Sequence, residues 1–224
     1  MNRNFYGMNL NVTMILIIIN MVVFMAVHLL AMTGNSWLID SLPLDSSILT
    51  TILHPWTLIT SMFMHWDIWH FFMNMLALFF IGQYIESILG TRRYLITYFA
   101  GGIAGGIFYV LFALFPLSLL PALGVSGHSF AVGASGAIFG IFAALAVMRP
   151  NQLVYLFPLP VPITLPVAVM LSFFAAMFVF GGMTSVANSA HLGGIAGGVI
   201  CGYYFRNKSR PLYEYDEYGN IYRY

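Results

Sequence analysis

Residues 133–148 read GASGAIFGIFAALAVM, and residues 189–205 read SAHLGGIAGGVICGYYF. Both stretches are strongly apolar, yet the first carries Ser135 near its start and the second carries His191. Polar and ionisable groups are costly inside hydrocarbon, so in a membrane protein they usually face an interior or a water-filled cavity and indicate a functional site. The two stretches therefore predict two membrane helices whose hydroxyl and imidazole are partners in catalysis.

The composition of the whole chain is that of a membrane protein. Of its 224 residues, 60% are hydrophobic and 7% are charged, against roughly 25% charged in an ordinary soluble domain. Apolar runs near the ~20 residues that cross a bilayer cover residues 10–32, 69–89, 94–115, 133–148, 162–181 and 189–205. We therefore expect an all-α polytopic fold with six transmembrane helices. The first run is longer than the apolar region of a signal peptide and lacks a clear cleavage site, so we expect it to be retained as a helix.

The basic residues predict how these helices are oriented. They are confined to Arg3, to Arg92 and Arg93, to Arg149 and to the segment 206–224. Because positive charge collects on the cytoplasmic side, both termini are predicted to be cytoplasmic, and the loops 33–68, 116–132 and 182–188 to lie outside. Residues 1–205 are expected to form one membrane domain, and residues 206–224 a solvated cytoplasmic tail. The net charge of +1 gives no indication of nucleic-acid binding.

This topology places four polar residues near the outer ends of parallel helices: His70, Asn74, Ser135 and His191. Ser135 precedes Arg149 by 14 positions and His191 precedes Arg206 by 15, so at ~1.5 Å per residue both stand about 21–23 Å above the cytoplasmic edge. They are 56 positions apart in sequence and can be neighbours only if the fourth and sixth helices pack closely. Glycines at four-residue spacing allow such an approach, and they occur at Gly136 and Gly140 in one helix and at Gly194, Gly198 and Gly202 in the other.

The chemistry that fits these residues is nucleophilic attack on an amide. A serine hydroxyl needs a base to remove its proton, and a neutral imidazole within hydrogen-bond reach provides one. No carboxylate lies in the outer halves of the spans, so we expect a Ser135–His191 dyad without an acidic third member. The backbone N–H of Ser135 at a helix start, with His70 and Asn74 on one helix face, would stabilise the oxyanion. Phe139, one turn below Ser135, is placed to support the His191 ring by stacking.

Other classes of site fit less well. His65 and His70 are five residues apart, a spacing that does not align two metal ligands on a helix, and the His-Glu-x-x-His motif is absent. We expect no metal and no cofactor, and we interpret His65 as a loop or interface residue. An aspartyl protease is excluded because every aspartate lies outside the predicted spans. Glu86, near the inner end of the second span, is interpreted as a structural hydrogen-bonding acid.

The same residues resemble the rhomboid family of intramembrane serine proteases. The resemblance rests on Gly133-Ala134-Ser135-Gly136, on His191 with Gly194 and Gly198, and on His70-Phe71-Phe72-Met73-Asn74, and it covers about residues 55–205. It implies a six-helix core with Ser135 as nucleophile, His191 as base, and His70, Asn74 and the Ser135 amide as oxyanion donors. It also implies single-span membrane-protein substrates, cleaved in or just outside the bilayer. Asn188 fits the family pattern and is expected to cap the sixth helix; Gly133, Gly136, Gly194 and Phe139 complete the supporting residues.

The chain departs from the family pattern at two positions. Trp56 is followed by Thr57 where many members have arginine, and Phe139 stands where many have tyrosine. The resemblance also implies that the fifth helix, with Phe173, Phe174, Met177 and Phe178, forms a lateral gate against the second helix.

Two other functions compete with the protease. A rhomboid-like protein that binds client helices without cutting them, in quality control or trafficking, typically lacks the serine or the histidine, and this chain keeps both. A small transporter is less favoured because no charged residue lines the middle of a span. A compact core is typical of a bacterial inner-membrane protein with its active site near the outer face. The oligomeric state and the physiological substrate are left open.

Overall fold

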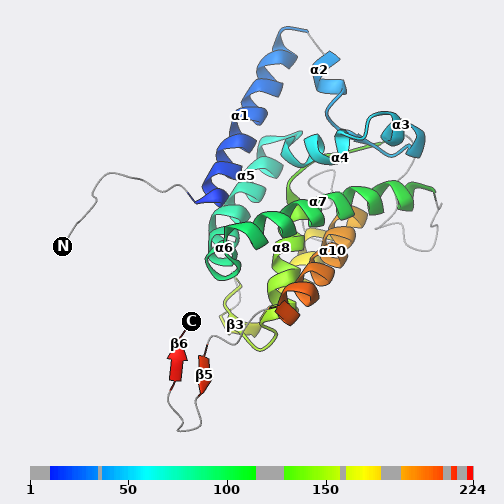
Figure 1. Ribbon diagram of the computed structural model, residues 1–224. Helices are drawn as coiled ribbons and strands as arrows, with labels where there is room; N and C mark the ends of the chain where they lie inside the picture. Colours follow the sequence, from blue (N-terminus) through cyan, green and yellow to red (C-terminus); the bar gives the residue numbers. More distant parts are fainter. Residues whose placement is uncertain are drawn as a thin grey trace, which may run out of the picture.

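The computed structural model describes residues 11–34, 37–114, 129–156, 160–177, 188–208, 213–215 and 221–223. Helices occupy all six of the apolar ranges (Figure 1): α1 (Val12–Met32), α5 to α6 (Ile68–Leu89), α7 (Thr91–Leu114), α8 (Ser135–Met148), α9 (Leu165–Ala175) and α10 (Asn188–Lys208). Three of them, α1, α5 to α6 and α7, are each long and apolar enough to cross a bilayer. The chain is thus mainly helical, whereas the number of crossings and the side on which the termini lie stay predictions.

The centre of the fold is a tight group of three helices. α7, α8 and α10 pack against one another, and Figure 1 shows α7 lying across the other two. α8 is buried on nearly every side along its length, as expected for a helix that is apolar all round. The contact between the fourth and sixth predicted helices is thereby confirmed. α7 packs closely on the same two helices, as the small residues Gly101, Gly102, Gly105 and Gly106 in its sequence indicate.

The second predicted helix is divided into three parts. α5 (Ile68–Ala77) and α6 (Gln83–Leu89) flank a π-helical segment, η2 (Leu78–Gly82). Asp67 caps the N-terminus of α5, where its carboxylate accepts a hydrogen bond of 2.8 Å from the backbone N–H of His70. This cap fixes the first turn of the helix that carries both His70 and Asn74.

Glu86 ties α6 to the beginning of α1. Its carboxylate accepts hydrogen bonds from the backbone N–H groups of Val12 and Thr13 and from the hydroxyls of Thr13 and Thr91. An anion at a helix N-terminus satisfies free N–H groups and complements the helix dipole. The prediction that Glu86 is a structural acid is confirmed.

Short strands, which the sequence did not predict, accompany the helices of this mainly α-helical fold. The described residues form three antiparallel pairs: β1 (Leu44–Asp45) with β2 (Phe130–Ala131), β3 (Leu153–Val154) with β4 (Ile163–Thr164), and β5 (Tyr213–Tyr215) with β6 (Ile221–Arg223). β3 and β4 flank a connection that contains Pro160 and Pro162, residues that disfavour helix. β1 and β2 belong to loops that are far apart in sequence, so a local pattern could not predict their pairing. α10 continues to Lys208, beyond the expected end at residue 205.

The segment between α1 and α5, which the sequence predicts to lie on the outer side (the outer segment), is built from small elements. It contains α2 (Trp37–Asp40), β1, α3 (Ile48–Leu53), α4 (Thr57–Thr60) and the 3-10 turn η1 (Ser61–Phe63). Trp56 and Trp66 are exposed on it, in keeping with side chains that favour the membrane interface. α4 packs on α7, and η1 contacts α8, so this loop rests directly against the central helices.

Candidate active site

Ser135 is the first residue of α8, directly after a sharp turn in the backbone. Gly133, two residues earlier, has φ +121°, a conformation that side chains other than glycine rarely adopt. Its N–H donates a 2.8 Å hydrogen bond to the carbonyl of Ser61 in η1, which holds the turn against the outer segment. The backbone N–H groups at the start of α8 have no partner within the helix, so they are available to an oxyanion beside Ser135.

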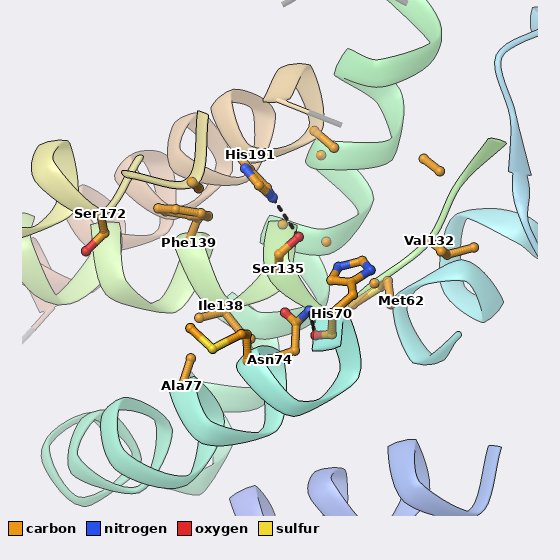
Figure 2. Close-up of a pocket in the computed structure, with 18 of the residues that line it drawn as sticks. Met62, His70, Asn74, Ala77, Val132, Ser135, Ile138, Phe139, Ser172 and His191 are labelled. Atoms are coloured by element: carbon orange, nitrogen blue, oxygen red, sulfur yellow. Dashed lines mark hydrogen bonds between the residues drawn. The ribbon is translucent and has the colours of Figure 1, made fainter. Parts of the chain in front are cut away.

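His191 reaches Ser135 from the neighbouring helix. Its Nε2 lies 2.7 Å from the Ser135 hydroxyl oxygen, and Figure 2 shows this contact across the space between α10 and α8. The imidazole is almost completely buried, and its Nδ1 makes no hydrogen bond with any part of the chain that the structure describes. The arrangement is therefore a serine and a histidine without a described acidic partner.

Phe139 packs against the other side of the pair. The centroid of its ring lies 4.8 Å from that of His191, with the planes tilted by 41°. On α9, the ring of Phe173 contacts that of Phe139, with a centroid distance of 6.3 Å. The one-turn spacing from Ser135 thus puts an aromatic ring beside the imidazole, where it limits rotation of the imidazole.

His70 and Asn74 approach the same turn from α5. Both are buried, and the amide nitrogen of Asn74 donates a 2.9 Å hydrogen bond to the carbonyl of His70. A Cβ built on Gly133 would lie 2.7 Å from Cε1 and Nε2 of His70 and 3.9 Å from Nδ2 of Asn74. A side chain at position 133 would therefore collide with the His70 ring, and Figure 2 shows His70 and Asn74 beside Ser135.

All four residues line one cavity of about 660 Å³. Its walls are apolar residues of α5 and α8, such as Met73 and Phe142, and small residues of α9, namely Ser172, Ala175 and Ala176. Of the residues expected at a lateral gate, Phe173 is buried against Phe139, whereas Phe174 is exposed and Phe178 lies outside the described residues. α9 therefore presents small side chains to the cavity opposite α5.

Glycines set the separation of the helices that carry Ser135 and His191. A Cβ on Gly194 would collide with the carbonyl oxygen of Gly136, and one on Gly198 with that of Gly140. α7 also approaches α10 closely, because a Cβ on Gly105 would lie 2.7 Å from the carbonyl oxygen of Ala190, the residue before His191. Contact of this kind between backbones is possible only where side chains are absent.

The strand that leads to the turn is anchored by a network that the sequence analysis missed. Tyr109 of α7 shares a 2.8 Å hydrogen bond with the hydroxyl of Ser129, and Ser129 exchanges two more with Ser46 in the outer segment. These bonds extend the β1–β2 pairing and fix the approach to Gly133. No sequence pattern links the three residues, since Ser46 and Ser129 are 83 positions apart.

Two further predicted residues have the following positions. Asn188 is the first residue of α10 and is buried; its capping role stays a prediction. His65, interpreted from the sequence as a loop or interface residue, is fully buried and its ring contacts that of His70. Among the described residues, no three His, Cys, Asp or Glu side chains are grouped as metal ligands.

Comparison with known proteins gives a consistent result. A family model described as "Rhomboid domain" matches residues 53–208. Rhomboid protease GluP of Bacillus subtilis is 33% identical over 144 residues, which cover 64% of this chain and 24% of that protein. Putative rhomboid protease YdcA of the same organism is 30% identical over 199 residues, or 83% of this chain and 90% of that protein.

A third relative is named as inactive. Inactive RHOMBOID-like protein 8 of Arabidopsis thaliana is 28% identical over 140 residues, which cover 62% of this chain and 35% of that protein. The chain spans less than half the length of GluP and of RHOMBOID-like protein 8. These relatives include proteins named as proteases and one named as inactive.

Proposed function

Because this chain belongs to the rhomboid family, we propose that it is an intramembrane serine endopeptidase that uses Ser135 as nucleophile and His191 as general base. The observation that carries the proposal is the 2.7 Å contact between the Ser135 hydroxyl and Nε2 of His191. The apolar helices and the family make the chain an integral membrane protein. Its substrates are proposed to be single-span membrane proteins whose chain enters the cavity between α5 and α9.

The reaction follows from the placement of the groups. His191 takes the proton of Ser135 as the oxygen attacks the carbonyl carbon, and then gives the proton to the leaving amine. An ester between Ser135 and the substrate remains, and water hydrolyses it with His191 acting again as base. The oxyanion formed in each half is stabilised by the Ser135 amide and by His70 and Asn74; loss of one such donor costs on the order of 10²–10³ in kcat.

The site is proposed to lie near the outer face of a bacterial inner membrane, with both chain termini in the cytoplasm. The support for this orientation is the distribution of basic residues: Arg92 and Arg93, Arg149, and Arg206 lie at the ends of α7, α8 and α10 that are distant from Ser135 and His191.

Cleavage of a model single-span substrate in liposomes tests the proposal. Wild-type protein should cut and should react with a fluorophosphonate, whereas Ser135→Ala and His191→Ala should do neither. Ser87→Ala is the matched control, because Ser87 of α6 does not line the cavity and its replacement should leave both activities intact. The mass of the product locates the cut, which we expect near the outer membrane face.

The alternative is a client-binding protein without protease activity, a reading that the relative named as inactive keeps open. A folded wild type that binds the substrate helix but neither cuts it nor reacts with the fluorophosphonate would establish the alternative. Equal cleavage by wild type and Ser135→Ala would mean that another nucleophile acts.

A further inference from the structure

His65 lies between η1 and α5 and has no exposed surface. Its ring contacts the ring of His70 edge to face, with centroids 5.1 Å apart and an interplanar angle of 69°. It also contacts the ring of Phe71, with centroids 5.6 Å apart and an interplanar angle of 86°. It does not line the cavity that contains Ser135. The side chain is therefore behind His70, away from the place where a substrate would bind.

The environment of His65 is unfavourable for a polar ring. The ring interacts with the backbone of Phe63, but neither ring nitrogen makes a hydrogen bond of ordinary geometry within the described residues, whereas the Nδ1 atoms of His28 and His54 each contact a backbone carbonyl. Burying polar groups that are only weakly paired costs free energy, so an apolar residue of similar size would suit the stability of this site better. A buried unsatisfied group of this kind calls for another explanation.

The explanation that the contacts offer is the orientation of His70. On one side, the Cε1 and Nε2 edge of His70 fits into the space left by the missing side chain of Gly133. On another side the His65 ring packs against it, while the Asp67 cap fixes the backbone from which it projects. With Gly133 and His65 in place, the His70 ring has little room to rotate away from Ser135.

We propose that His65 is a positioning residue that holds the His70 imidazole in the orientation in which it donates to the oxyanion. This inference rests on the proposed protease function and on the role of His70 within it. A planar ring at position 65 is the essential feature, because it is the face and edge of the ring that contact His70. A flexible aliphatic side chain of similar volume would leave His70 free to adopt other rotamers.

A double-mutant cycle tests this coupling. The rate of reaction with a fluorophosphonate is measured in detergent for wild type, His65→Leu, His70→Ala and the double variant, and thermal unfolding confirms that each is folded. His65→Leu should slow the reaction by about tenfold, and His70→Ala by on the order of 10²-fold. If His65 acts through His70, the double variant should be no slower than His70→Ala alone.

Two further variants separate positioning from packing. His65→Phe keeps a planar ring and should restore most of the wild-type rate, with KM for a peptide substrate unchanged throughout. Met64→Ala is the matched control, because Met64 is the adjacent residue and equally buried; it should lower thermal stability but leave the rate of the folded protein near that of wild type.

The inference is overturned if the two single losses multiply in the double variant, if His65→Phe is as slow as His65→Leu, or if Met64→Ala slows the reaction as much as His65→Leu. A wild-type protein that does not react, or a Ser135→Ala variant that does, refutes the proposed function itself. The two kinds of failure are thus distinguished in the same set of measurements.

Discussion

The glycine contact beside the active site predicts a large effect from one added methyl group. Gly194 lies one turn after His191 on α10, and a Cβ at this position would collide with the carbonyl oxygen of Gly136, the residue after Ser135. A backbone carbonyl cannot rotate away as a flexible side chain can. Gly194→Ala therefore forces α10 and α8 apart at the level of the dyad.

Two opposing terms decide the sign of the stability change. Alanine favours a helix interior over glycine by about 1 kcal/mol, whereas overpacking of a close contact costs about 1–3 kcal/mol and occasionally more. Since the collision is with backbone, the overpacking cost should be at the upper end, about 3 kcal/mol, and subtracting the helix preference of about 1 kcal/mol leaves a net destabilisation of about 2 kcal/mol. Gly136→Ala is the matched control: its Cβ would lie 3.4 Å from the carbonyl oxygen of Ala190, an ordinary contact, so the helix preference should leave stability within about 1 kcal/mol of wild type.

Gly194→Ala should also lower the activity of the protein that remains folded. The dyad depends on a single 2.7 Å contact between Ser135 and His191, and a misplacement of about 1 Å costs on the order of 10²-fold in rate. Thermal unfolding in detergent and the fluorophosphonate reaction rate, measured well below the unfolding temperature, give the two quantities. If Gly194→Ala is as stable and as reactive as wild type, the glycines do not set the distance between the two helices.

Three other changes have defined outcomes. Glu86→Gln should lower the free energy of unfolding by about 1–3 kcal/mol, because the charged acceptor for the first turn of α1 is lost; unchanged thermal unfolding would contradict this role. Phe139→Ala should slow fluorophosphonate labelling by about tenfold through a looser His191 ring, and Phe139→Tyr should not; equal rates for both would remove the ring from the mechanism. Burial, aided by the nearby His70, lowers the pKa of His65 from 6.5 to about 3. As the pH falls below about 6.5, His65 therefore binds a proton in the unfolded chain but not in the folded one, and the folded state loses stability until the pH reaches about 3. At pH 5 this loss of stability amounts to about 2 kcal/mol, and it should be absent in His65→Phe. If unfolding of wild type and of His65→Phe depends on pH in the same way, the explanation is refuted.

The sequence predicts the parts of the site that lie within single helices. Ser135 and His191 could be paired because glycine spacing, helix depth and charge distribution all depend on local or periodic features. The position of His70 and Asn74 followed in the same way from their spacing on one helix face. These features are properties of single helices, which a sequence pattern describes well.

What the sequence did not reveal depends on contacts between distant segments. The β1–β2 pair and the Tyr109–Ser129–Ser46 network join loops that carry no recognisable periodicity. The burial of His65 could not be predicted because its five-residue spacing from His70 was informative only about metal ligation. Its contact with His70 arises from the turn between η1 and α5, two elements that both contact α8.

His191 has no acidic partner among the described residues, so packing rather than a hydrogen bond to an acid orients its imidazole. In a serine, histidine and aspartate triad, the acid holds the imidazole in position. Here the Nδ1 atom makes no hydrogen bond within the described chain, and the ring is held by Phe139 and by a helix that lies directly on its neighbours. Because interiors of this density are deformed only at a cost, a few glycines and one aromatic ring suffice to keep the imidazole within reach of the serine. Activity should therefore depend on the separation of α8 and α10 more steeply than on any charge outside the site.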